Sequence, residues 1–192
     1  AAYWNLTGHA PQKPDKNWLR TRKDWPSIGS MVAHARHDPE SKLPGNVALP
    51  YPIYDGGWAN GQHAGFLGMK YDPVIMKPDQ GKPYDGKSPV SGHLSFDFIE
   101  GVNEERLADR RNLLTKLSGS AQPTEPLEHY QQRVFDMLLD EETRRAFKVD
   151  AEPEQQQRRY GPHILGQSLL TARRLTGAGV PLVTVYAAAG DL

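Results

Sequence analysis

The stretch that decides the fold lies near the end of the chain, where residues 159–186 read RYGPHILGQSLLTARRLTGAGVPLVTVY. Its first half predicts a helix, because apolar residues recur at helical spacing. The expected buried stripe comprises Leu165, Leu169 and Ala172, widened by Ile164 and Leu175. The last turn would hold Arg173 and Arg174, and the helix would stop at Gly177 and Gly179.

The second half of this stretch, Leu182 to Tyr186, predicts a buried strand, because it is short, almost continuously apolar and rich in β-branched residues. A helix followed by such a strand is typical of an α/β sheet with helices packed on its faces. In open α/β sheets, ligands bind beyond the carboxyl ends of the strands. Only residues 187–192 follow this strand, so we expect the site to be incomplete within the chain.

Upstream of this stretch, composition divides the chain into four parts of one partial domain, residues 1–192. These parts are core elements in 1–50, a long loop layer rich in glycine and proline in 51–101, a helical segment in 102–158, and the helix and core strand in 159–192. The helical segment looks inserted between parts of the core. The predicted fold class is therefore α/β, with a partial sheet, an inserted helical segment and long Gly/Pro-rich loops.

The shorter elements follow from local patterns. Between Trp25 and Arg36 we expect a helix whose apolar face is Ile28, Met31, Val32 and Ala35, and a short strand follows at Val47 to Leu49. A helix before Gly8 would end there, with this glycine in the left-handed region. Asp140 is expected to cap a helix from Glu141 to Phe147. Flanking helices are expected at Asn103 to Leu117, Thr124 to Leu138 and Glu152 to Tyr160.

Residues 50–101 show little regular structure, yet they contain apolar and aromatic residues that a disordered segment would lack. Structureless segments of this length inside a domain are often lids or binding loops. Two interpretations stay open: a packed layer near a site, or a structural wrap.

Composition excludes several classes of function. The 192 residues hold 23 basic and 23 acidic side chains with no run of one sign, so nothing indicates a nucleic acid or an anionic membrane as partner. No apolar run is long enough to span a bilayer. Cysteine is absent, which excludes disulfides and thiolate metal sites.

Among the seven histidines, His9 and His163 are the best candidates for a site. His9 follows a glycine turn, and His163 opens the helix of the deciding stretch. A helix N-terminus attracts anions, so His163 could bind or polarise an anionic group. A capping or core role for His163 stays open beside it. No nucleophile motif, phosphate-binding loop or histidine pair at metal-ligand spacing is present.

Six blocks of sequence, taken together, resemble the bacterial family known as domain of unknown function 1501, which is sulfatase-like. They run in the family's order and are Leu6 to Pro11, Asp24 to Ser30, Leu49 to Trp58, Gly65 to Pro73, Leu107 to Leu114 and Arg159 to Ser168. The resemblance implies the alkaline-phosphatase and sulfatase fold, with divalent metals at the carboxyl edge of a largely parallel sheet. It also implies that this chain is an internal fragment.

The resemblance further implies hydrolysis of a phosphate or sulfate ester, assisted by a divalent metal of unspecified identity. The sequence LTGHAP at 6–11 looks like the turn behind the nucleophile of sulfatases, with His9 where they have arginine. The nucleophile would then lie upstream of Ala1, and no metal ligand falls within the chain. Supporting residues near the site would be Thr7, Gly8, His9, Asp55, Gly57, His163 and Gln167.

Members of the family typically carry a twin-arginine export signal, so the resemblance implies an exported protein, periplasmic or extracellular. The substrate would be a small-molecule or polysaccharide ester, and the fragment alone would be inactive. The alternative is a non-catalytic exported binding or structural protein with the same fold.

Overall fold

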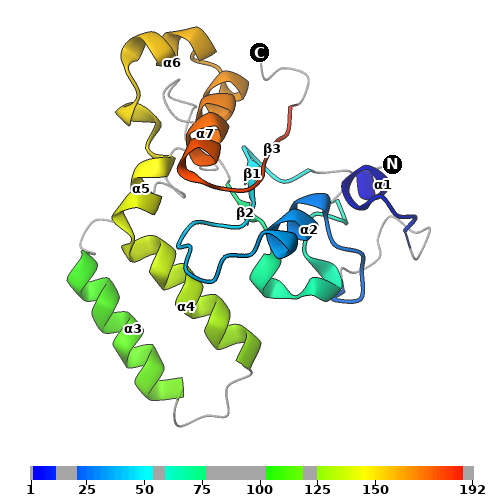
Figure 1. Ribbon diagram of the computed structural model, residues 1–192, viewed down its shortest axis with the longest axis vertical. Coiled ribbons are helices and arrows are strands. Elements are labelled where there is room, and N and C mark those ends of the chain that lie inside the picture. The colour runs from blue at the N-terminus through cyan, green and yellow to red at the C-terminus, as the bar shows by residue number, and fades with distance from the viewer. Residues whose placement is uncertain (1, 12–20, 54–58, 77–102, 119–124, 188–192) are drawn as a thin grey trace.

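The computed structural model describes residues 2–11, 21–53, 59–76, 103–118 and 125–187 (Figure 1). The helices in these ranges are α1 (Ala2–Thr7), α2 (Ile28–Ala35), α3 (Glu104–Ser118), α4 (Glu125–Leu139), α5 (Glu141–Phe147), α6 (Glu154–Tyr160) and α7 (Ile164–Ala178). The strands are β1 (Val47–Leu49), β2 (Val74–Ile75) and β3 (Val183–Val185). Short 3₁₀ turns occupy Gly65–Leu67, Met69–Tyr71 and Val149–Ala151. The fold is therefore α/β and mostly helical, which confirms the predicted class.

The sheet is parallel, with the strand order β2-β1-β3. Val47 pairs with Val74 on one side and with Val183 on the other, so β1 lies in the middle (Figure 1). The predicted strand at Val47 to Leu49 is confirmed, and the predicted strand at Leu182 to Tyr186 is confirmed with shorter bounds. The strand β2 is a correction, because it lies in the part of the chain that was expected to be a loop layer.

The core forms where α7, α4 and α5 pack against the sheet. Its buried members are Val47, Leu49, Met76, Met137, Ala146, Phe147, Leu175 and Val180. Helix α7 packs on β3 and α5, while α3 packs on α4 (Figure 1). The helical segment therefore joins the core through α4 and α5, with α3 on its outer side.

The buried face of α7 matches the predicted stripe only in part, because Leu175 is fully buried and Ala172 packs against the core, whereas Leu169 does not. Leu169 is 44% exposed, whereas its neighbour Leu170 is fully buried. The buried side also takes Ser168 and Thr171, whose hydroxyls donate to carbonyls one turn back at 2.6 and 2.9 Å. Because these hydroxyls are satisfied within the helix, small polar residues can face the core in place of leucine.

The end of α7 and the face of α2 are also corrected. The helix α7 ends at Ala178, so the predicted stop is confirmed at the C-cap Gly179, which has a φ of 112°, and is wrong at Gly177, which lies within the helix. Arg173 and Arg174 therefore lie before the last turn. In α2 the buried residues are Ser30 and Ala33, while Ile28 is exposed. The N-cap Ser27 accepts the N–H of Ser30 at 3.1 Å. The predicted N-cap of α5 is confirmed, because Asp140 accepts the N–H of Thr143 at 2.7 Å. The predicted end of α1 at Gly8 is confirmed as well.

Candidate functional site

The first candidate group lies at the end of α1. Gly8 has a φ of 74°, as predicted, and its N–H donates to the carbonyl of Trp4 at 2.8 Å. The hydroxyl of Thr7 donates to the carbonyl of Tyr3 at 2.8 Å and accepts the N–H of His9 at 3.2 Å. Thr7 is buried, so its hydroxyl serves to end the helix.

This turn lies against the segment that follows β1. A Cβ added to Gly61 would lie 3.0 Å from the ring of Tyr3 and 3.1 Å from the methyl of Thr7. A side chain at this position would have to push Tyr3 or Thr7 aside by a few tenths of an ångström. The chain beyond the carboxyl end of β1 is thus in contact with the helix that ends at Thr7.

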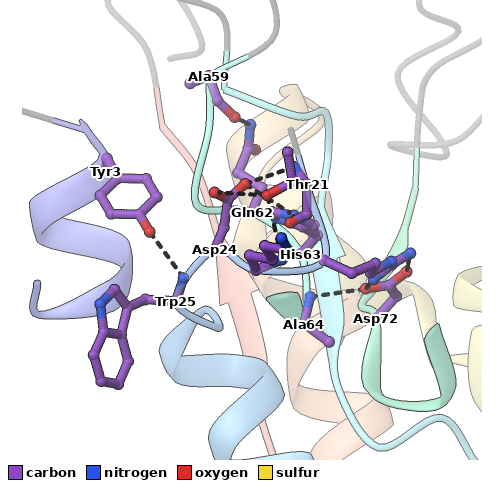
Figure 2. A network of polar contacts seen from close by, with 11 residues as sticks. Tyr3, Thr21, Asp24, Trp25, Ala59, Gln62, His63, Ala64 and Asp72 are labelled. Atoms are coloured by element: carbon purple, nitrogen blue, oxygen red, sulfur yellow. Dashed lines mark hydrogen bonds and ion pairs between the residues drawn. The ribbon is translucent and has the colours of Figure 1, made fainter. Parts of the chain in front are cut away.

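The imidazole of His9 stacks on the indole of Trp25, with 3.6 Å between ring centroids and 8° between ring planes. Phe66 meets the same indole edge-on, with centroids 5.3 Å apart. The N–H of Trp25 donates to the hydroxyl of Tyr3 at 2.9 Å, as Figure 2 shows. Burial, together with the nearby Asp24, raises the pKa of Tyr3 above its ordinary value. His9 therefore belongs to a small aromatic cluster, with one ring face covered.

Beside this cluster, Asp24 and His63 form a pair that sequence reasoning missed. The His63 Nε2 lies 3.5 Å from a carboxylate oxygen of Asp24 and 3.1 Å from the carbonyl of Thr21 (Figure 2). Both partners are acceptors, so Nε2 carries the proton. The Nδ1 atom is buried without a partner. The pair therefore holds the loop around Thr21 against the segment that contains His63.

Asp24 opens one of the six family blocks, but that block assigns it no role, and nothing in the sequence around His63 connects the two loops. The same region contains Gln62, whose amide accepts the N–H of Ile53 at 2.7 Å and donates to Ala59 at 2.7 Å. Gln62 thus joins the residues on either side of Asp55 and Gly57. Those two candidates lie outside the described residues.

The second candidate group lies at the start of α7. His163 is the N-cap, and its Nδ1 accepts the N–H of Gly166 at 3.0 Å. The amide of Gln167 donates to the carbonyl of Gly161 at 2.6 Å, while its oxygen is buried without a partner. The sequence left two roles open for His163, and the structure shows the capping role. Figure 1 shows that α1 and the start of α7 lie apart, so the candidates form two separate groups.

Among the described residues, no group of three or more histidine, aspartate or glutamate side chains is arranged to hold an ion. In the same ranges, no helix has the length and apolar character needed to cross a membrane.

Comparison with known proteins adds the family. The family model described as "Protein of unknown function (DUF1501)" matches residues 2–191. No curated protein and no solved structure matches the chain. Because the match covers nearly the whole sequence, the chain belongs to the DUF1501 family.

Proposed function

We propose that this chain is the supporting part of an exported, sulfatase-like hydrolase that acts on phosphate or sulfate esters. The observation that carries the proposal is the contact between the Thr7–Gly8–His9 turn and the segment after β1, through Gly61. In sulfatase-like proteins the corresponding turn lies behind the nucleophile. Here it contacts the segment that follows the carboxyl end of β1, and sites of open α/β sheets form beyond the carboxyl ends of the strands.

In this proposal the nucleophile and the ligands of the divalent metal are residues outside the described ranges. The metal would neutralise the ester oxygens and activate the nucleophile when bound. The substrate would be a small-molecule or polysaccharide ester. The described residues would support the site without reacting. The Thr7–Gly8–His9 turn would lie behind the nucleophile, and Gln62 would fix the ends of the segment that contains Asp55 and Gly57.

A second candidate is a non-catalytic, exported binding or structural protein. One observation favours it: His163 Nδ1 and the Gln167 amide are used in bonds within the chain. Neither atom is therefore free to contact an ester.

To test this proposal, the protein is expressed from the whole reading frame, and its hydrolysis of an aryl phosphate and of an aryl sulfate is measured. Metal-dependent turnover that a chelator removes and added metal restores is the expected result. Failure to hydrolyse either ester with zinc, magnesium, manganese or calcium would favour the second candidate. The chain of 192 residues alone is expected to be inactive.

A pair of glycine variants tests the supporting role. Gly61 and Gly68 have φ values of 90° and 89°, but only Gly61 would bring a side chain against α1. Gly61→Ala is therefore expected to lower turnover of the whole protein about tenfold or more relative to Gly68→Ala, because both carry the same backbone strain. Equal turnover in the two variants would remove the α1 contact from the mechanism.

A further inference from the structure

A cavity of about 300 Å³ lies at the amino edge of the sheet. Its walls include the segments that lead into all three strands: residues 43–45 before β1, residues 70–72 before β2, and Gly179 and Pro181 before β3. The end of α2 and Arg133 of α4 complete the lining. The 3₁₀ turn Met69–Tyr71 packs against both of these helices. A volume of this size is within the range of small-ligand sites.

The lining is rich in positive charge. It contains four basic side chains, which are Arg36, His37, Lys70 and Arg133. They come from three separate parts of the chain, at residues 36–37, 70 and 133, so the fold brings them to one place. Like charges gathered in this way repel one another and do not stabilise the chain by themselves.

Of the two carboxylates of the lining, Asp72 is balanced by a cation outside the cavity. Both oxygens of Asp72 are held by the guanidinium of Arg22, at 2.8 and 2.7 Å, and one also accepts the N–H of Ala64 at 2.7 Å (Figure 2). Asp38 accepts the N–H of Glu40 at 2.9 Å. Because Arg22 already balances Asp72, the permanent cations of the lining outnumber the one remaining carboxylate.

The individual cations also lack carboxylate partners. Among the residues that the structure describes, no acidic side chain lies within salt-bridge distance of Arg36, Lys70 or Arg133. The Arg133 guanidinium donates to the carbonyl of Leu43 at 3.0 Å, and burial lowers the pKa of Arg133. An anion in the cavity would offset the cost of burying this charge.

One wall of the cavity is aromatic and well fixed. The ring of Tyr71 is met edge-on by His34 and His37, with centroids 4.9 and 5.7 Å away. The Lys70 Nζ lies 5.7 Å from the same ring centroid. This packing keeps His37 and Lys70 on the cavity side of the turn before β2.

We propose that this cavity binds a compact oxyanion with two negative charges, of which sulfate and phosphate are the simplest. Guanidinium and ammonium groups that line one part-enclosed space can form charge-assisted hydrogen bonds with such an ion. The inference goes beyond the proposed function and does not depend on it.

The test titrates the full chain with sodium sulfate and with sodium phosphate by calorimetry, against sodium chloride at equal ionic strength. Saturable binding is expected with a Kd of about 1 mM or tighter. Acetate, with one charge, is expected to bind about tenfold more weakly. An adventitious, unsaturable salt effect that chloride reproduces would overturn the proposal, and so would acetate binding as tight as sulfate binding.

Matched variants locate the site. Lys70→Gln and Arg36→Gln alter exposed side chains, so both variants are expected to fold, which circular dichroism checks. Each should weaken sulfate binding about tenfold, because each removes a charged donor. Lys116→Gln, an equally exposed change on α3 away from the cavity, should leave binding unchanged. Equal binding by all three variants would exclude the cavity as the site.

Discussion

The two edges of the sheet use polar residues in opposite ways. Near the carboxyl edge, the groups that the sequence singled out are bonded to their own chain: Thr7 ends α1, and His163 and Gln167 fix the start of α7. At the amino edge, Arg36 and Lys70 face a cavity without a carboxylate partner among the described residues.

This difference separates two physical roles. A polar group bonded within the chain contributes to stability, and its removal leaves an unsatisfied partner. Cations gathered around a cavity contribute little to stability, and their removal changes what the cavity can bind. Variants at the carboxyl edge should therefore act mainly on folding, and variants at the amino edge mainly on ligand affinity.

The largest effect is expected from Gly166→Ala. A Cβ at this position would lie 1.8 Å from the carbonyl oxygen of Tyr160, so the start of α7 would have to move away from the end of α6. We expect the free energy of unfolding to fall by about 3 kcal/mol, measured by urea denaturation.

Gly177→Ala is the matched control on the same helix. Nothing lies within 4 Å of the added Cβ, so alanine should stabilise the chain by about 0.5–1 kcal/mol. Similar effects of the two variants would contradict the close packing at the start of α7.

The next largest effect distinguishes the two faces of α7. Leu170→Ala should lower the free energy of unfolding by about 2.5 kcal/mol, because Leu170 is fully buried and its removal leaves a cavity. Leu169→Ala should change it by less than about 0.5 kcal/mol, because Leu169 is 44% exposed. A larger loss of stability in Leu169→Ala than in Leu170→Ala, measured by thermal or urea unfolding, would mean that Leu169 is buried as periodicity predicts.

These helices show what the sequence could and could not predict. Helix and strand positions followed from periodicity, caps and turns, so β1, β3 and the Gly8 end of α1 were predicted correctly. The buried face of α7 was predicted only in part: Leu175 and Ala172 pack in or against the core, but Leu169 is exposed. Ser168 and Thr171 are buried instead, because their hydroxyls are satisfied within the helix. The pattern of hydrophobic residues does not reveal such hydrogen bonds.

The strand β2 and the amino-edge cavity could not be predicted for another reason. β2 has two residues and is defined by its pairing with β1, so it has almost no local pattern. The cavity joins Arg36, Lys70 and Arg133, which are far apart in the sequence and share no motif. Only the tertiary fold brings them together, whereas the candidates near the carboxyl edge came from short local motifs.

A smaller effect is expected at the N-cap of α7. His163→Ala removes the acceptor of the Gly166 N–H and should cost about 1 kcal/mol in urea unfolding. His163→Asp should retain the stability of the parent chain, because aspartate is a good N-cap and its charge favours the helix N-terminus. Loss of stability in both variants would mean that the imidazole does more than cap the helix.

The smallest effect concerns pH at the amino edge. Burial lowers the pKa of His37, and the nearby charges of Lys70, Arg133 and His34 lower it further. Asp38 raises the same pKa and so opposes this shift in part. His37 therefore gains its charge at a lower pH than an unperturbed histidine does. A bound dianion favours that charge, so sulfate affinity should rise as pH falls.

We expect a rise of about threefold between pH 7.5 and 5.5, the effect of one added charge at short range in a hydrated site. Sulfate is the probe because it keeps its charge over this range, whereas phosphate titrates. His37→Gln should bind sulfate as the parent chain does at pH 7.5 and should lose the rise at low pH. A rise that persists in this variant would assign the pH dependence to another group and leave His37 outside the cavity's chemistry.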